Sequence, residues 1–306
     1  MSGVPEELAG RRAVVTGGAG FIGSHLADRL SPACEVSVLD TLSAGGVSNL
    51  PAGVSLTQGD VRDRETVQRV VDGADVIFHE AGLVSVAESV ASPAESHDVN
   101  ATGTLRVLES ARRADARVVL ASSAAVYGVP ESVPIAESQP KAPTSPYGLD
   151  KLAADHYARL YADLYGLETV ALRYFNVYGP RQSADYAGVI GTFLDQARAG
   201  GPLTVHGDGT QTRDFVHVED IVDANLAAAV TDTTGRAFNV GTGRSHSVAD
   251  LAGIVRDLAG TDPAVTHTDA REGDIPASRA DISRSRRVLG YEPSIDLRTG
   301  IRRLLG

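Results

Sequence analysis

Short apolar runs alternate with amphipathic segments along the first 175 residues. The runs at 13–16, 35–40, 54–60, 75–79, 117–122 and 169–173 are rich in β-branched residues and have the length of strands. The segments 21–30, 64–71, 93–114 and 146–165 carry apolar residues at helical spacing. Strands that alternate with helices usually form a parallel sheet covered on both faces, so the pattern predicts an α/β fold.

The alternation loosens after about residue 175. Turn-rich segments at 178–187 and 207–212 interrupt shorter elements there. We therefore predict a main domain over 1–175 and a smaller C-terminal α/β domain over 176–306, with the run 237–240 returning to the main sheet. No linker separates the two parts, so we expect a ligand in the cleft between them.

A glycine-rich turn follows the first strand and opens the first helix, with Gly17, Gly20 and Gly23 spaced as G-x-x-G-x-x-G. Glycine lets the backbone approach a pyrophosphate closely, and the helix N-terminus offers free N–H groups. The second strand ends at Asp40, where a carboxylate accepts from the adenosine ribose and repels a 2′-phosphate. These features predict a Rossmann-type doubly wound sheet that binds NAD rather than NADP. Asp60, which ends the third strand, is either an acceptor for the adenine amino group or a turn residue.

Tyr147 and Lys151 are spaced i, i+4 on a predicted helix that Ser145 and Pro146 begin, so both side chains lie on one face. An ammonium group beside a phenol lowers the phenol pKa, which would let Tyr147 take a hydroxyl proton. Such a pair also arises by chance on exposed helices. Ser123, at the carboxyl end of a predicted strand, favours the catalytic interpretation because strand ends line the ligand crevice.

The composition excludes several other classes of function. The chain has 306 residues and a formal net charge of −11, which disfavours a nucleic-acid-binding protein. A single cysteine, Cys34, leaves no internal disulfide, and the eight histidines show no metal-ligand spacing, so no metal site is expected. No apolar stretch is long enough to span a membrane and no secretory signal is visible, so we expect a cytoplasmic protein. Lys141 and Lys151 are the only lysines, which fits either adaptation to high salt or a GC-rich genome.

Six motifs resemble the extended short-chain dehydrogenase/reductase family, and within it the 4-epimerases of UDP-glucose and UDP-N-acetylglucosamine. They are TGGAGFIGSHL at 16–26, SSAAVYG at 122–128, SPYGLDK at 145–151, LRYFNVYGPRQ at 172–182, GDGTQTRDFVHVEDI at 207–221 and REGDIPASRAD at 271–281. The resemblance covers nearly the whole chain. It implies that 1–175 binds NAD and that 176–306 mainly binds a nucleotide-sugar.

The resemblance also implies the site residues. The NAD site would comprise Gly17, Gly20, Phe21, Ile22, Gly23, Asp40, Asp60, Val61, Ala81, Gly82, Leu83, Asn100, Ser122, Tyr147, Lys151, Tyr174 and Phe175. The UDP-sugar site would comprise Ser85, Ser123, Tyr147, Asn176, Val189, Thr204, Val205, His206, Arg213, Arg271, Asp274 and Ser278. Without the resemblance, Arg213 and Arg271 would be read as surface ion-pair residues; bidentate binding of phosphate by guanidinium is the physical reason to place them at the diphosphate.

Two positions distinguish the reactions found in the family. Dehydratases and decarboxylases resembling this chain carry an acidic residue beside the catalytic Ser or Thr, where this sequence has Ala124, so oxidation and re-reduction at C4 is favoured over dehydration. Ser278 stands where epimerases restricted to non-acetylated sugars carry a larger residue, which predicts room for a 2-acetamido group.

Several alternatives stay open from sequence. They are a UDP-glucuronate 4-epimerase, another nucleotide-sugar oxidoreductase of the family, a dTDP-sugar in place of a UDP-sugar, and a non-catalytic Rossmann module that senses nucleotide or redox state. A homodimer through the helices at 93–114 and 146–165 is implied by the resemblance.

Overall fold

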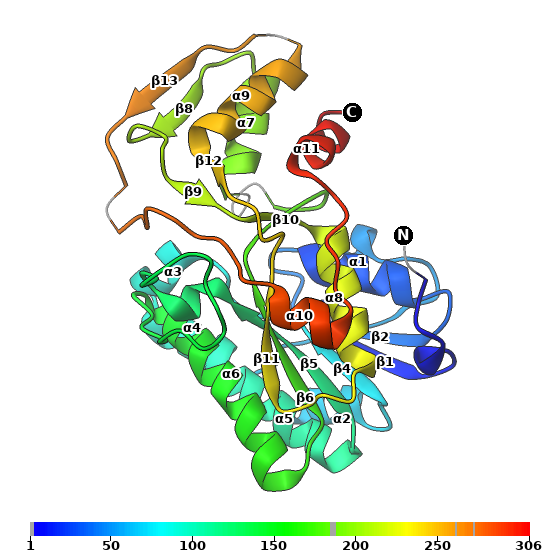
Figure 1. Cartoon of the computed structure of the whole chain (residues 1–306). Helices are drawn as coiled ribbons and strands as arrows, with labels where there is room; N and C mark the ends of the chain where they lie inside the picture. The colour runs from blue at the N-terminus through cyan, green and yellow to red at the C-terminus, as the bar shows by residue number, and fades with distance from the viewer. Residues whose placement is uncertain (1–2, 184–187, 261, 272) are drawn as a thin grey trace.

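A seven-stranded sheet in which every neighbouring pair is parallel forms the centre of the computed structural model, which describes residues 3–183, 188–260, 262–271 and 273–306 (Figure 1). The strand order is β3-β2-β1-β4-β5-β6-β11. The strands are β1 (Arg12–Thr16), β2 (Glu35–Asp40), β3 (Ser55–Gln58), β4 (Val76–His79), β5 (Arg117–Ser123), β6 (Thr169–Tyr174) and β11 (Arg236–Val240). The chain runs outward from β1 in one direction and from β4 in the other, so the ends of β1 and β4 flank the switch point where such sheets bind ligands.

Helices cover both faces of the sheet because successive strand residues point to opposite sides. Val15 belongs to the apolar cluster under α1 (Phe21–Leu30) and α8 (Val218–Val230). The preceding residue, Val14, belongs to the cluster under α2 (Arg64–Val71), α5 (Gly103–Ala114) and α6 (Pro146–Tyr165). The predicted doubly wound α/β fold is therefore confirmed, and the run 237–240 lies in β11, which pairs with β6 in the main sheet.

The predicted helix over 93–114 is a continuous run with an irregular centre. It comprises α4 (Pro93–His97), the π-helical turn η3 (Asp98–Thr102) and α5. Within η3, the side chain of Asn100 bonds both backbone groups of Leu83, at 3.0 Å each. A π-helical turn inserts an extra residue into a helix, often beside a functional site, and here it aims Asn100 at the loop after β4. The short helix α3 (Val86–Ala91), capped by Ser85, was missed from sequence.

The upper part of Figure 1 has a small core of its own. Phe193, Leu203 and Leu251 are buried there. The elements of this part are α7 (Gly188–Arg198), β8 (Leu203–His206), β12 (His246–Ser247), α9 (Val248–Ala259), β13 (Val265–Thr268) and α11 (Leu297–Leu305). Between it and the main sheet lie β7 (Asn176–Tyr178), β9 (Thr212–Arg213) and β10 (Phe215–His217). Residues 184–187 of the turn-rich segment predicted at 178–187 lie outside the described residues.

Not all of 176–306 belongs to the small core. The strand β11 is the edge strand of the main sheet, α8 packs on that sheet, and α10 (Ser283–Leu289) packs against β11 and α8. The remaining short helices are η1 (Glu6–Leu8), η2 (Val47–Asn49) and η4 (Ala124–Tyr127). The assignment of 1–175 and 176–306 as two functional domains stays a prediction.

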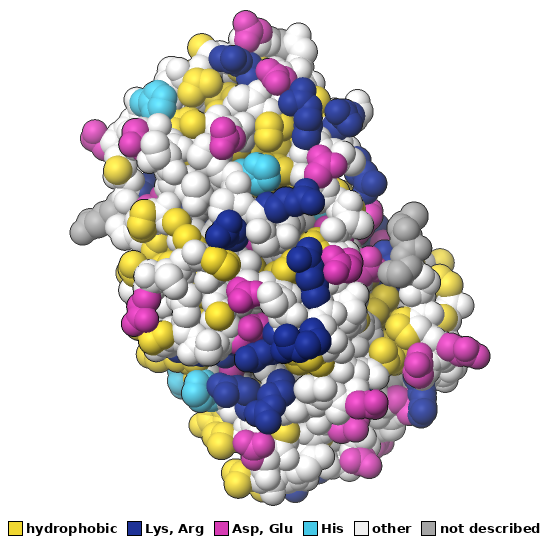
Figure 2. Space-filling view, in the orientation of Figure 1, with side chains coloured by type: hydrophobic (Ala, Val, Ile, Leu, Met, Phe, Trp, Pro, Cys, Tyr) yellow, Lys and Arg dark blue, Asp and Glu magenta, His cyan; other side chains and the backbone are white. Residues whose placement is uncertain are grey.

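Charges of both signs share the surface shown in Figure 2, where Lys and Arg side chains cross the middle of the face with Asp and Glu side chains among and around them. In the part of the chain that the structure describes, no helix combines the length and the apolarity needed to cross a membrane. The same residues contain no cluster of three or more His, Cys, Asp or Glu side chains suited to a metal ion.

Candidate active site

An open cavity of about 1350 Å³ lies at the carboxyl ends of β1, β4, β5 and β6 and extends to β8. It is lined by residues from the glycine loop, the three residues predicted to be catalytic, and the small C-terminal part. Most residues predicted for the cofactor and the substrate line this one cavity. Asn100, Val205 and Ser278 are the predicted residues that do not.

The glycine loop leaves no room for side chains. Gly17 has a φ of +69°, and a Cβ there would lie 2.7 Å from the backbone nitrogen of Ala81. A Cβ on Gly23 would lie 2.2 Å from the carbonyl oxygen of Gly17. The helix α1 then begins at Phe21 without a side-chain cap, so its first N–H groups stay available to a ligand. A pyrophosphate fits such a bare loop at a helix N-terminus.

Asp40 lies in the same cavity and also holds the loop in shape. Its carboxylate accepts from the backbone N–H of Ala19 at 2.9 Å and of Leu42 at 2.7 Å. These bonds use part of the acceptor capacity of the carboxylate and leave lone pairs for ribose hydroxyls. The residues present therefore fit NAD at this end.

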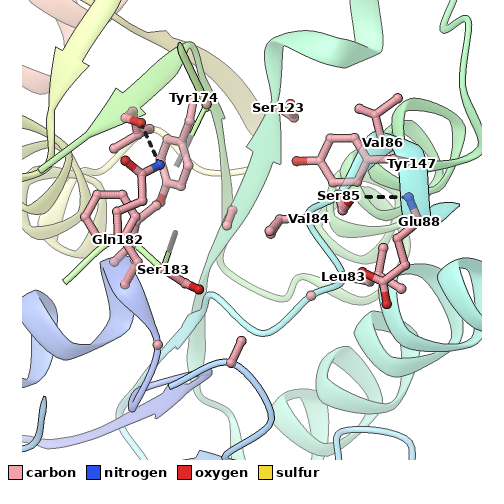
Figure 3. A pocket seen from close by; sticks show the side chains of 18 of the residues that line it. Leu83, Val84, Ser85, Val86, Glu88, Ser123, Tyr147, Tyr174, Gln182 and Ser183 are labelled. Atoms are coloured by element: carbon pink, nitrogen blue, oxygen red, sulfur yellow. Dashed lines mark hydrogen bonds between the residues drawn. The ribbon is translucent and has the colours of Figure 1, made fainter. Parts of the chain in front are cut away.

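The helix α6 begins as the sequence predicts. The hydroxyl oxygen of Ser145 accepts from the backbone N–H of Gly148 at 3.1 Å, and Pro146 occupies the first turn. Tyr147 and Lys151 both reach the cavity from this helix. Figure 3 shows the Tyr147 ring beside the carboxyl end of the strand that carries Ser123. The structure thus brings the three residues predicted to be catalytic to one wall of the cavity.

The predicted effect of Lys151 on Tyr147 is not found in this structure. Burial raises the pKa of Tyr147, and its hydrogen bond with Ser123 lowers it only in part. The ammonium group of Lys151 donates to the carbonyl oxygen of Ala121 at 2.9 Å, and burial lowers the pKa of Lys151 to about 8. The reason is that both groups are desolvated, which disfavours phenolate and ammonium alike.

Asp60 is already engaged where an adenine contact was predicted. Its carboxylate accepts from the guanidinium of Arg62 at 3.0 and 2.6 Å, and these bonds hold the pKa of Asp60 below its ordinary value. Arg62 also pairs with Glu95 at 2.7 Å, and both line the cavity. Sequence reasoning missed Arg62, although it follows Asp60 by two residues at a strand end.

The residues predicted for the UDP group come together around β8 and β9. Arg213 forms an ion pair with Asp274 and also donates to the carbonyl oxygen of Thr212 at 2.7 Å. Arg271 lies 3.2 Å from a ring nitrogen of His206. Two guanidinium groups from distant parts of the chain thus share this end of the cavity, and guanidinium groups bind phosphates well.

Each of the three predicted site residues that do not line the cavity has a packing or hydrogen-bonding role in the fold. Asn100 holds Leu83, which does line the cavity. Val205 is fully buried in the small core. Ser278 is buried, and its backbone N–H donates to the carbonyl oxygen of Thr212 at 3.0 Å, so its segment pairs alongside β9, the strand that carries Arg213.

Three acidic residues in the lining were missed from sequence: Glu80, Glu88 and Glu95. Glu80 follows β4 directly, and Glu88 lies in α3 near Ser85 (Figure 3). Position 124 carries no carboxylate, but Glu80 places one in the same cavity. The signal was available, because residues at the carboxyl ends of parallel strands meet at the crevice.

A family model described as the NAD dependent epimerase/dehydratase family matches residues 13–241. The chain belongs to this family. The UDP-glucose 4-epimerase of Mycolicibacterium smegmatis is 38% identical over 300 residues, which cover 95% of this chain and 96% of that protein. The predictions of the extended family and of NAD as its cofactor are confirmed, and the chain is an enzyme of a family whose members use NAD.

Two solved structures share the whole fold. The UDP-N-acetylglucosamine 4-epimerase of Methanobrevibacter ruminantium, solved with UDP-N-acetylmuramic acid, is 35% identical with a TM-score of 0.93 and 97% of each chain covered. The UDP-glucose 4-epimerase of Thermus thermophilus, solved with NAD, is 38% identical with a TM-score of 0.87, covering 95% of this chain and 96% of that one. This NAD-dependent epimerase/dehydratase therefore shares its sheet and its small C-terminal part with enzymes of nucleotide-sugar metabolism.

Proposed function

We propose that this enzyme inverts C4 of a UDP-hexose or UDP-N-acetylhexosamine through a transient 4-keto sugar. The observation that carries the proposal is the position of Tyr147, Lys151 and Ser123 on one wall of a cavity. The glycine loop lies at one end of this cavity, and Arg213 and Arg271 lie at the other. A dinucleotide and a diphosphate sugar bound at these two ends would meet at Tyr147.

The side chains divide the chemistry among them. Tyr147 takes the proton of the C4 hydroxyl and later returns it, and the hydroxyl of Ser123 donates to the reacting oxygen. The charge of Lys151 favours the phenolate of Tyr147 once the cavity also holds a positively charged ring. Bound NAD would supply the hydride acceptor for C4 and the hydride donor to the other face of the sugar. Rotation of the keto sugar about its diphosphate linkage, with Arg213 and Arg271 holding the diphosphate, exposes that face.

Dehydration is a weaker interpretation for this site. Eliminating water requires a group to protonate the leaving hydroxyl, beside the group that handles the C4 proton. Ala124 and Ala125 follow Ser123 in η4, so neither offers a carboxylate. The carboxylate of Glu80 accepts from the hydroxyl of Tyr174 at 2.8 Å, and Tyr174 is proposed to lie at the cofactor, so Glu80 is assigned to the cofactor side as well.

The test of the proposed reaction is product analysis. The purified enzyme is incubated with UDP-glucose, UDP-galactose, their N-acetyl analogues, UDP-glucuronate and dTDP-glucose. Interconversion of the gluco and galacto forms supports the proposal. Exclusive turnover of UDP-glucuronate would make the enzyme a UDP-glucuronate 4-epimerase, and loss of water from any sugar would overturn epimerisation. Near-ultraviolet absorbance of a reduced nicotinamide ring on adding a UDP-sugar separates an enzyme from a nucleotide-sensing module.

Acceptance of the 2-acetamido group is predicted to depend on Ser278. Ser278 is buried beside β9, the strand of Arg213 that lines the cavity, so a tyrosine ring at this position would disturb the sugar end of the cavity. In Ser278→Tyr we expect the ratio of acetylated to plain sugar turnover to fall at least about tenfold, the usual scale for a hydrophobic clash in a pocket. Both rates are measured on the same preparation. Ser278→Ala, which adds no bulk, is the control and should keep the ratio; an unchanged ratio in Ser278→Tyr would remove this position from substrate selection.

The homodimer is part of the same proposal. Leu149, Leu160 and Leu164 are exposed on α6, and Val90 is exposed on the neighbouring α3. Exposed apolar side chains gathered on adjacent helices suit an interface with a second copy. Sedimentation equilibrium of the purified enzyme tests this, with a mass of twice one chain expected.

A further inference from the structure

Glu80 is a cavity carboxyl group that the proposed C4 chemistry does not use. It follows β4 directly, and its backbone N–H donates to the carbonyl oxygen of Thr16, the last residue of β1, at 3.1 Å. Its side chain accepts from the hydroxyl of Tyr174 at 2.8 Å, and that hydroxyl accepts from the amide of Asn225, also at 2.8 Å. The carboxyl group is therefore held in place from β6 and α8 as well as from its own strand.

Glu80 lies where the nicotinamide half of a bound dinucleotide would extend. A pyrophosphate at the glycine loop after β1, with the adenosine ribose at Asp40 after β2, leaves the nicotinamide half to extend over the ends of β4 and β5 toward Tyr147. Glu80 lies on that path, between the glycine loop and the wall of Tyr147. This placement rests on the proposed function.

We propose that Glu80 selects the redox state of the bound cofactor. Its carboxylate stabilises the positively charged oxidised nicotinamide ring and gives no such attraction to the neutral reduced ring. A carboxylate within about 6 Å of a unit positive charge, at an effective dielectric constant of about 20, changes binding by on the order of 10- to 100-fold. An epimerase must end every cycle with oxidised cofactor, and a fixed negative charge near the ring favours that state.

The attraction between Glu80 and the oxidised ring also makes cofactor binding depend on pH. Burial raises the pKa of Glu80 to about 7, although the hydrogen bond from Tyr174 and the charge of Lys151 lower it. A positively charged ring would favour the ionised carboxylate, so the NAD⁺ complex holds fewer protons near pH 7 than the NADH complex. Raising the pH through about 7 therefore favours bound NAD⁺ over bound NADH.

Other titratable groups lie near Glu80. Lys151, with a pKa of about 8, would favour NAD⁺ on losing its proton, so its effect has the same sign at higher pH. Burial lowers the pKa of His79 to about 3, and raises that of Tyr174 well above its ordinary value. Burial also raises the pKa of Tyr147. Once NAD⁺ is bound, Tyr147 and Lys151 affect its binding with the same sign as Glu80, so the contribution of Glu80 is the part of the rise near pH 7 that Glu80→Gln removes.

The experiment exchanges the bound cofactor of the intact enzyme against mixtures of NAD⁺ and NADH until equilibrium, from pH 6 to 9. Free cofactor is removed, the protein is denatured, and the released NAD⁺ and NADH are quantified by chromatography. For the unmodified enzyme we expect the ratio of bound NAD⁺ to bound NADH to rise about tenfold or more with pH, beginning near pH 7. This readout does not depend on turnover.

Two variants distinguish the effect of the Glu80 charge from the effect of its hydrogen bond with Tyr174. Glu80→Gln keeps an acceptor for Tyr174 but removes the charge, so the ratio should shift toward NADH and lose its rise near pH 7. Tyr174→Phe keeps the charge but removes the hydrogen bond, so the rise with pH should persist. If Tyr174→Phe abolishes the rise and Glu80→Gln does not, or if the unmodified enzyme shows a constant ratio, the inference on Glu80 is wrong while the proposed function stands. An enzyme that retains neither cofactor form would overturn both.

Discussion

Replacing Tyr147 by phenylalanine is expected to lower the turnover of the UDP-sugar by at least about 100-fold. The phenol is the group proposed to carry the C4 proton, and loss of a positioned acid or base usually costs about 10²- to 10⁴-fold. The ring itself would remain, so the wall of the cavity keeps its shape. Turnover is measured by product formation at saturating substrate, and cofactor content is measured in the same sample.

The matched control is Tyr157→Phe, on the same helix. Tyr157 is exposed and does not line the cavity, so its hydroxyl has no role in the proposed chemistry. We expect that variant to keep its rate within about twofold, since exposed substitutions rarely change function or stability by more than about 0.5 kcal/mol. A Tyr147→Phe enzyme with a near-normal rate would remove Tyr147 from the acid/base role.

Replacing Asp155 by alanine is expected to lower the free energy of unfolding by about 3–5 kcal/mol. Arg173 is buried with only 2% of its surface exposed, and its guanidinium donates to Asp155 at 2.9 and 3.2 Å. Asp155 is fully buried and also accepts from Ser122 at 3.2 Å. Without the carboxylate, the guanidinium stays buried and unpaired, which is the costly half of breaking a buried ion pair. Denaturant unfolding measures the change.

The contribution of Asp155 to the free energy of unfolding should depend on pH. Burial raises the pKa of Asp155, but the hydrogen bonds and charges of Arg173 and Arg159 outweigh this and hold it below its ordinary value. A carboxyl group with a lowered pKa in the folded state contributes stability above its unfolded pKa and loses it as the pH falls through the folded pKa. The difference between the parent and Asp155→Ala should therefore shrink in acid.

The control for Asp155 is a surface pair. Asp195 and Arg198 lie 3.4 Å apart on α7 with more than half of each side chain exposed. Asp195→Ala should change stability by less than about 1 kcal/mol, because exposed ion pairs contribute little. Equal losses in the two variants would mean that the buried position of Asp155 is not the source of the effect.

Much of the fold and the candidate site could be predicted from sequence because short segments carry the chemical signals that set their own structure. The glycine loop needs residues without a Cβ, and the N-terminus of α6 needs a hydroxyl cap and accepts proline, so both carry their signals within a few residues. The alternation of strands and helices predicted the parallel sheet, and the strand-end rule placed Ser123 near Tyr147. Helix ends with such signals, as in α1, α2 and α6, were predicted at the residues where the structure has them.

Contacts between segments that are distant in sequence could not be predicted from such local signals. The π-helical turn at Asp98–Thr102 carries Asn100, which bonds Leu83 from a distant part of the chain. The position of Ser278 is set by the pairing of its segment with β9. The pKa of Tyr147 has the same kind of dependence. The spacing of Lys151 shows its charge, whereas the burial that opposes the phenolate exists only in the folded chain.

By itself the sequence determined the fold class, the cofactor loop and the residue types at the candidate centre, because spacing along a strand or helix decides which side chains share a face. Only the tertiary structure decided which of those side chains meet. It joined Arg213 to Asp274, enclosed Arg173 with Asp155, and brought Glu80 against Tyr174 in the cavity. Burial and pairing across the fold set the charge of such groups, and neither is a property of any short stretch of chain.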